Sequence, residues 1–245
     1  MDDFSVSLLQ IGVSGETPKN IARMREMARS VSRRTDALAL PEMWAGENAS
    51  CDEAELAIGA LSDSCRESGV FAVSGGIPWK SGGQTTVRMW AIDDLGHLFA
   101  HYDKVHLSSK GGEAKKFAPG NAPLVFMAGE VACAALSGYD LMFPEFCRQL
   151  SLAGARFFFV SASWPEELAG SWELAIRSCA FLNQSYVVAC NGSGPRAQFR
   201  GHSAIVSPEG EIVERLGGEE GILTASFSLA EADRRRADIP IETDR

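Results

Sequence analysis

Short apolar segments alternate along the chain with segments whose apolar residues recur at helical spacing. Strand-like runs over 4–11 and 37–40 flank a stretch in which Ile21, Met24 and Ala28 fall on one face of a helix. This alternation is typical of an α/β protein. Further helices are predicted over 53–68, 143–153 and 169–183, and further strands over 70–74, 123–127, 131–137, 156–161, 186–190, 203–206 and 211–215.

The pattern changes between residues 84 and 102, where two strand-like runs surround the turn sequence Asp93-Asp94-Leu95-Gly96. Such a turn between two strands predicts a β-hairpin. The sheet content is therefore mixed, with crossover units in places and hairpins in others. Two such sheets packed face to face with helices outside would satisfy this pattern, and so would an ordinary three-layer fold.

Composition and charge narrow the class of protein. The 245 residues are 45% hydrophobic and 22% charged, which is ordinary for a globular protein, and no linker-like segment divides them. We therefore expect one domain over 1–245. The 23 basic and 32 acidic side chains give a formal charge of −9, which argues against a nucleic-acid partner because phosphates would be repelled.

The chain has the features of a cytoplasmic protein. Its first ten residues, MDDFSVSLLQ, lack the basic start and long apolar run of a signal peptide. No segment approaches the roughly 20 apolar residues that span a bilayer, so no membrane partner is expected. The six cysteines form no CxxC pair and several lie in apolar runs: Cys51, Cys65, Cys133, Cys147, Cys179 and Cys190.

Three segments carry residues suited to chemistry. Glu42 follows the apolar strand 37–40, and ligands bind at the carboxyl ends of strands in α/β proteins. A carboxylate there could act as a general base, whereas the simpler interpretation is a solvated loop residue. Lys104, in the second segment 102–107, could neutralise a carboxylate or stabilise an oxyanion, or could be an ordinary surface lysine.

The same segment contains His106, which is more often a hydrogen-bonded structural residue than an acid–base group in such a setting. The third segment, 136–145, runs from a strand into a helix. A sharp turn of this kind can aim backbone N–H groups at a substrate, although a plain connection with a glycine at 138 would look the same.

In this order, the motifs Pro41-Glu42, Lys104-Val105-His106-Leu107 and Gly138-Tyr139-Asp140-Leu141 resemble the nitrilase superfamily of carbon–nitrogen hydrolases, which uses a Glu–Lys–Cys triad. Glu42 and Lys104 are 62 residues apart, and Lys104 and Gly138 are 34 apart, as that family allows. Later segments also match: Phe159–Pro165, Trp172-Glu173, Asn183-Gln184, Gly201-His202-Ser203 and Pro208-Glu209-Gly210. The small bacterial amidases that act on short ω-amide acids look most similar.

The resemblance implies a four-layer α-β-β-α sandwich, a small amide or carboxylate ligand, no cofactor and no metal. It also implies a homodimer formed through the helix over 143–153, with help from the helix near 169–183. Phe146, Leu150 and Leu152 supply apolar surface there, and the simpler interpretation of these three residues is internal packing. Carried over by position, Glu42 is the general base, Lys104 the oxyanion stabiliser and Glu113 a second, supporting glutamate. The backbone N–H of Tyr139 completes the oxyanion site, and Trp164 lies with Tyr139 among the substrate-binding residues.

The nucleophile position falls on Gly138, which has no side chain and cannot form the family's thioester. Other positions depart as well. The arginine expected after Tyr-Asp-Leu is Met142, and the family's R-A-x-E-N motif loses its arginine to Cys179 and its glutamate to Leu182. We therefore expect either an impaired carbon–nitrogen hydrolase or a catalytically silent relative that binds a small ligand or serves assembly.

A substitute nucleophile is the remaining question. Ser137 is adjacent to Gly138, but neighbours on a strand point to opposite faces, so we expect Ser137 to face away from Glu42. Cys133 lies five residues before Gly138. Because this offset is odd, we expect Cys133 also to point to the face away from the site. We expect Cys147 to lie in the core stripe of its helix, and Cys179 to lie on a helix that packs near the site.

Overall fold

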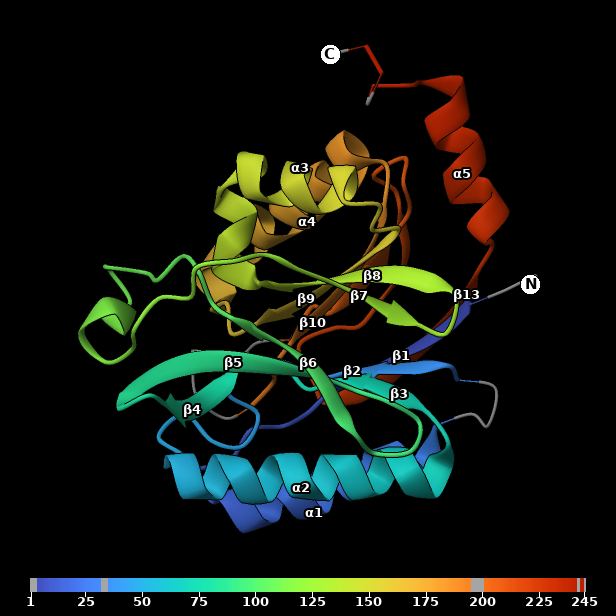
Figure 1. The fold of residues 1–245 in the computed structure, drawn as a ribbon. Coiled ribbons are helices and arrows are strands. Elements are labelled where there is room, and N and C mark those ends of the chain that lie inside the picture. The colour runs from blue at the N-terminus through green and yellow to red at the C-terminus, as the bar shows by residue number, and fades with distance from the viewer. Residues whose placement is uncertain (1–3, 32–34, 195–200, 242, 245) are drawn as a thin grey trace.

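The structure, a computed structural model, describes residues 4–31, 35–194, 201–241 and 243–244. Within these ranges, no helix combines the length and the apolar character that crossing a membrane requires. Two β-sheets lie at the centre of the molecule, and helices cover the outer face of each sheet (Figure 1).

The first sheet has a parallel centre and antiparallel edges. Its parallel strands are β1 (Phe4–Gln10), β2 (Ala37–Ala39) and β3 (Phe71–Val73). The antiparallel strands are β13 (Gly221–Phe227), beside β1, and β5 (Gln84–Ile92), beside β3, with β4 (Ile77–Ser81) and β6 (Leu98–Asp103) both paired to β5. The pairing of β5 with β6 is the hairpin that the sequence predicts.

The second sheet repeats this plan with strand order β12-β11-β10-β9-β8-β7. Its parallel centre consists of β8 (Val131–Ser137), β9 (Phe157–Ala162) and β10 (Tyr186–Asn191). Its antiparallel strands are β7 (Leu124–Ala128), β11 (Ala204–Val206) and β12 (Ile212–Arg215).

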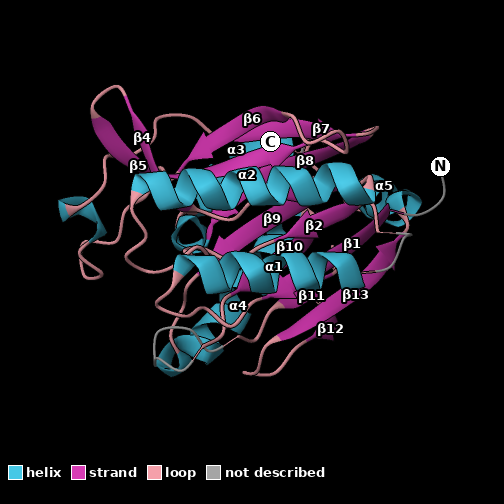
Figure 2. Cartoon of the chain, turned by 90° about the horizontal axis from the view of Figure 1, so that it is seen from below, coloured by secondary structure: helices cyan, strands magenta, loops and turns pink. Residues whose placement is uncertain are grey.

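Helices form the two outer layers, as Figures 1 and 2 show. The first sheet is covered by α1 (Thr17–Ser30) and α2 (Cys51–Ser68), and the second by α3 (Pro144–Leu152) and α4 (Ala169–Asn183). The C-terminal helix α5 (Leu229–Asp238) follows β13. The four-layer α-β-β-α sandwich implied by the resemblance is therefore confirmed.

Burial on both faces explains why the central strands are continuously apolar. Leu8 and Leu9 are both fully buried, but Leu8 packs in the core between the sheets and Leu9 packs against the helices. Successive residues of a strand point to opposite faces, so a strand between two layers needs apolar residues at every position. Phe157, Phe158 and Phe159 show the same behaviour in β9.

The strands and helices predicted from the pattern are present, and their ends differ from the predicted ones by at most two residues. The pattern did not predict β4, β13 and α5. Strand β4 contains Pro78, which is tolerated because that strand lies at the edge of its sheet. The helix α5 is rich in charged residues, and Ala232 is its one buried residue, so it lacks a recognisable apolar stripe.

Candidate active site

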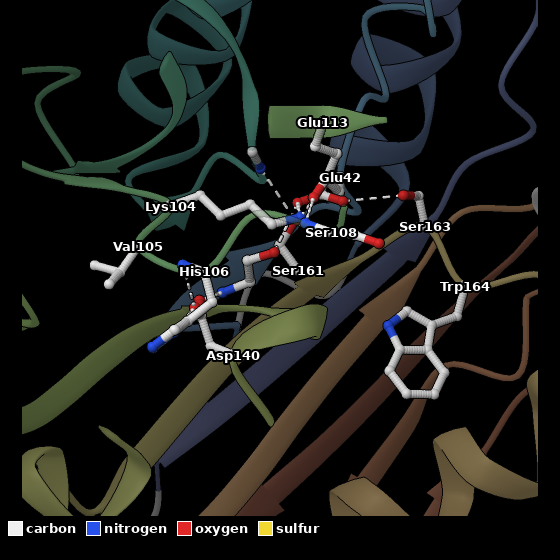
Figure 3. A network of polar contacts seen from close by, with 12 residues as sticks. Glu42, Lys104, Val105, His106, Ser108, Glu113, Asp140, Ser161, Ser163 and Trp164 are labelled. Atoms are coloured by element: carbon white, nitrogen blue, oxygen red, sulfur yellow. Dashed lines mark hydrogen bonds and ion pairs between the residues drawn. The ribbon is translucent and has the colours of Figure 1, made fainter. Parts of the chain in front are cut away.

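Strand ends from both sheets meet at one place. Glu42 follows β2, Lys104 follows β6, and Gly138 follows β8. The backbone N–H of Glu42 donates to the carbonyl of Ala162, the last residue of β9, at 3.1 Å. This bond ties the loop after β2 in the first sheet to the end of a central strand in the second sheet. Figure 3 shows the resulting network of side chains.

The carboxylate of Glu42 is buried and fully engaged. Its Oε1 accepts hydrogen bonds from Lys104 Nζ at 3.1 Å and from Ser137 Oγ at 2.8 Å. Its Oε2 accepts from Ser163 Oγ at 2.9 Å. Glu42 is 3% exposed, so these partners replace the water that an ionised carboxylate requires.

Lys104 lies between two carboxylates. Besides Glu42, its ammonium donates to Glu113 Oε1 at 2.7 Å, and Glu113 Oε2 accepts from the backbone N–H of Ser108 at 2.7 Å. Burial by itself lowers the pKa of Lys104, but the charges of Glu42 and Glu113 outweigh it, and the net effect is a raised pKa. Lys104 therefore stays cationic, and three sequence-predicted site residues form one charged cluster.

The turn after β8 is fixed by a second buried carboxylate, Asp140. It accepts from the backbone N–H of Ser137 at 2.8 Å, from the Tyr102 hydroxyl at 2.6 Å and from His106 Nδ1 at 2.8 Å. The His106 ring stacks on Phe143 at 3.6 Å between centroids. His106 therefore has the structural role that the sequence favoured. Sequence reasoning did not single out Asp140, although it lies inside the third motif.

Gly138 lies against a tryptophan. A Cβ atom added at Gly138 would lie 2.8 Å from Ala162 Cβ and 2.9 Å from Trp164 Nε1, which is closer than such atoms pack. The Trp164 backbone is held on both sides by Asn191, whose side chain accepts from its N–H at 2.8 Å and donates to its carbonyl at 3.0 Å. The Trp164 indole therefore borders the space that a side chain at position 138 would enter.

Tyr139 belongs to a 3₁₀ helix that begins at Gly138 and ends at Met142. The first N–H groups of a helix have no acceptor within that helix, and Gly138 and Tyr139 are the first two residues of this one. This arrangement fits the oxyanion role expected of the Tyr139 backbone. The Tyr139 ring packs edge-on against Phe143 at 5.8 Å.

The expected orientation of Ser137 is wrong, because its hydroxyl donates directly to Glu42. The expectation used strand alternation, but β8 ends at Ser137 and the chain turns into the 3₁₀ helix at the next residue. Alternation does not apply across such a turn. Sequence reasoning also missed Ser163, whose hydroxyl is the second one bonded to Glu42. The signal that could have indicated both serines is their position in the chain, since Ser137 precedes Gly138 and Ser163 precedes Trp164.

The candidate thiols are structural. Cys133, Cys147 and Cys179 are buried in the core, as expected for Cys147. Burial raises the pKa of Cys133. The pKa of Cys179 is raised first by a hydrogen bond with Cys147 and then by burial. The raised pKa values favour protonated thiols at Cys133 and Cys179, and a protonated thiol is a poor nucleophile.

Lys104 is positioned by contacts with β5, the strand that pairs with the preceding strand β6. Its backbone N–H donates to Val87 O at 2.8 Å, and the neighbouring Asp103 forms a bidentate ion pair with Arg88, both contacts at 2.7 Å. Burial raises the pKa of Asp103, but hydrogen bonds from Arg88 and Thr86 outweigh it, so the pKa is lowered below its ordinary 3.8.

This shift predicts a pH-dependent effect of Asp103→Asn. A carboxyl with a lowered folded-state pKa stabilises the fold above its unfolded-state pKa, and that stabilisation is lost as the pH falls through the folded-state pKa. The variant should therefore be less stable than the unmodified chain at neutral pH, and the difference should shrink below the ordinary value of 3.8. Urea unfolding midpoints across this range measure it, and an undiminished difference in strong acid would contradict the prediction.

Comparisons with known proteins identify the family of this chain. The family model described as "Carbon-nitrogen hydrolase" matches residues 5–237. The chain belongs to the carbon–nitrogen hydrolase family. Within the family it is similar to a Bacillus subtilis protein named 2-oxoglutaramate amidase, with 31% identity over 98% of this chain and 97% of the relative. It is also similar to Omega-amidase NIT2 of Xenopus tropicalis, with 26% identity over 100% of this chain and 96% of the relative.

Solved structures show the same carbon–nitrogen hydrolase fold. One is a variant of the amidase from Nesterenkonia sp. AN1, described as carrying the acetamide moiety of fluoroacetamide at its active site cysteine. It superposes with a TM-score of 0.85 at 23% identity and covers 98% of this chain and 97% of that one. The chain is thus a nitrilase-superfamily protein similar to the ω-amidases, as the motifs predicted.

Proposed function

We propose that this carbon–nitrogen hydrolase binds a short amide, or the corresponding carboxylate, beside Glu42 and Lys104. The observation that carries the proposal is the buried Lys104 ammonium between Glu42 and Glu113, with Glu42 bonded to Ser137 at the start of the 3₁₀ helix that carries the N–H groups of Gly138 and Tyr139. A primary amide has a carbonyl oxygen to accept from those donors and an NH₂ group to donate to a carboxylate. The names of the amidase relatives support the same substrate class.

We further propose that amide hydrolysis through a thioester is closed to this chain. That route requires a thiol at position 138, and glycine supplies none. Removing a covalent nucleophile from a hydrolase costs on the order of 10⁶-fold in rate and leaves what positioning and the oxyanion site supply. Glu42 could still activate a water molecule, but that reaction is slow beside covalent catalysis.

The test separates binding from turnover. Calorimetric titration with short ω-amides and N-carbamoyl acids should give saturable binding that Lys104→Met abolishes. Release of ammonia from the same compounds should be far slower than for a cysteine-bearing relative assayed alongside. Rapid turnover that is retained when Cys133, Cys147 and Cys179 are each replaced by alanine would refute the proposal that the chain has lost this activity. Absence of binding by every compound would refute the ligand class.

A second candidate function, assembly, is favoured by apolar side chains on the surface of the second helical layer. Met142 and Leu182 replace charged residues of the family motifs, and both are exposed together with Leu174 and Phe181. Phe146 and Leu150, which the sequence suggested for the dimer surface, are buried and pack internally, whereas Leu152 is exposed. We propose that α4 and the end of α3 form a homodimer interface.

Two leucines of equal exposure test the interface. Leu174 on α4 and Leu56 on α2 are both 68% exposed, and they lie in opposite outer layers. Leu174→Glu should convert a dimer to a monomer in light scattering at micromolar concentration, because it places charge in an apolar contact. Leu56→Glu should leave the dimeric mass measured by light scattering unchanged. A monomeric unmodified chain, or equal effects of the two variants, would contradict the proposal.

A further inference from the structure

We propose that Ser137 supplies the attacking oxygen that replaces the missing thiol, so that the chain retains slow acyl transfer through a serine ester. The inference rests on the proposed binding of an amide beside Glu42 and Lys104. Its first support is a hydrogen bond of 2.8 Å from Ser137 Oγ to Glu42 Oε1. A hydroxyl bonded to a carboxylate base is the arrangement by which a serine is activated as a nucleophile.

Both partners of this bond are held in place. Asp140 accepts from the Ser137 backbone N–H at 2.8 Å and is itself fixed by Tyr102 and His106. Glu42 is fixed through its backbone bond to Ala162. An attacking group and its base that are already oriented lose little entropy on reaching the transition state.

Charge stabilisation is available at the same point. Lys104 donates to the oxygen of Glu42 that also accepts from Ser137, so the ammonium lies beside the site where charge would develop. The residue after Ser137 is Gly138, which begins the 3₁₀ helix and has an N–H with no acceptor inside that helix. The N–H of the residue after a nucleophile is a common oxyanion donor.

Ser163 is the competing hydroxyl, and its surroundings are less suitable. It donates to Oε2 of Glu42, whereas Lys104 contacts Oε1. The residue after it, Trp164, already donates its backbone N–H to Asn191 at 2.8 Å and so has no oxyanion donor to offer. The comparison assigns the nucleophile to Ser137.

Access to Ser137 requires movement of a neighbour, because Ser137 is 1% exposed. Trp164 borders Gly138, the residue after Ser137, and is only partly buried, so we take its indole as the side chain that a ligand displaces. Replacing Trp164 with alanine should therefore accelerate acylation of Ser137.

The proposed reaction balances without an additional reactant beyond water. Ser137 Oγ bonds to the amide carbonyl carbon while its proton passes to Glu42. The carbon–nitrogen bond then breaks, Glu42 returns the proton to the nitrogen, and ammonia leaves. Water adds to the resulting ester with Glu42 as base, and the ester bond breaks to release a carboxylic acid and restore the Ser137 hydroxyl.

The experiment is acyl trapping with a short p-nitrophenyl ester, read by intact mass and peptide mapping. We expect one acyl group on the peptide containing Ser137. Ser137→Ala should lower its rate of formation on the order of 10³-fold or more, because the attacking atom is removed. Glu42→Gln should slow acylation by removing the base, and Ser137→Cys should give a thioester that hydroxylamine cleaves. Ser163→Ala, which removes the other hydroxyl from Glu42, should leave the acyl group on the same peptide.

An acyl group on Ser163, on lysines only, or on Ser137→Ala at the unmodified rate would overturn the assignment. Mapping of the unmodified chain decides the question even if the Ser137→Ala variant does not fold. Amide binding without acylation of Ser137 would overturn this inference and leave the proposed ligand class standing. Acylation of Ser137 without binding of any amide would support this inference and overturn the proposed ligand class.

Discussion

Replacing Gly138 with cysteine should raise the rate of short-amide hydrolysis by at least about 10²-fold over the unmodified chain. The thiol would stand at the family's nucleophile position, one residue after Ser137, whose hydroxyl contacts the base Glu42. Lys104 contacts the same carboxylate, and its positive charge favours the thiolate. Full recovery is not expected, since Met142, Cys179 and Leu182 stand where the family has charged residues. Ammonia release from a short ω-amide measures the gain.

The same substitution should reduce stability. The new Cβ would lie 2.8 Å from Ala162 Cβ, so the surrounding atoms must shift. Overpacking of this kind costs about 1–3 kcal/mol. Gly138→Ala is the matched control, because it adds the same Cβ without a thiol. It should unfold at a similar urea concentration and show no gain in activity; equal activity of the two variants would contradict a thiol-dependent gain.

Lys104→Met should lower the free energy of unfolding by about 3–5 kcal/mol, the usual cost of removing one partner from a buried ion pair. Lys104 is 2% exposed, and its loss would leave the carboxylates of Glu42 and Glu113 without their shared cation. Desolvated carboxylates without a counter-charge are costly. Urea unfolding of the variant and the unmodified chain measures the difference.

Two further variants test this interpretation of the loss. Lys19→Met breaks an ion pair with Glu16 whose side chains are 68% and 63% exposed, and it should change stability little because such pairs are solvated. Adding Glu42→Gln to Lys104→Met should recover part of the lost stability, since it removes one uncompensated charge. A loss for Lys104→Met no larger than for Lys19→Met would show that the buried cluster is not ionised as described.

The sequence by itself determined the succession of strands and helices, whereas the four layers and the site residues Glu42, Lys104 and Glu113 were implied by the family resemblance of its motifs. Strands buried on both faces must be apolar at every position, and helices on one face must carry a stripe, so both leave clear local patterns. Glu42, Lys104 and Glu113 were found because they follow recognisable motifs in a fixed order. Edge strands such as β4 and the polar helix α5 left no such pattern, because little of their surface is buried.

Only the tertiary structure decided what surrounds the missing nucleophile. The hydrogen bond between Ser137 and Glu42 joins residues 95 positions apart and brings strands of different sheets together. Periodicity places a side chain relative to its own strand, but it carries no information about a turn at the strand's end or about the opposite sheet. The contact of Trp164 with the space beside Gly138 has the same origin, because packing between separate segments is set by the whole fold.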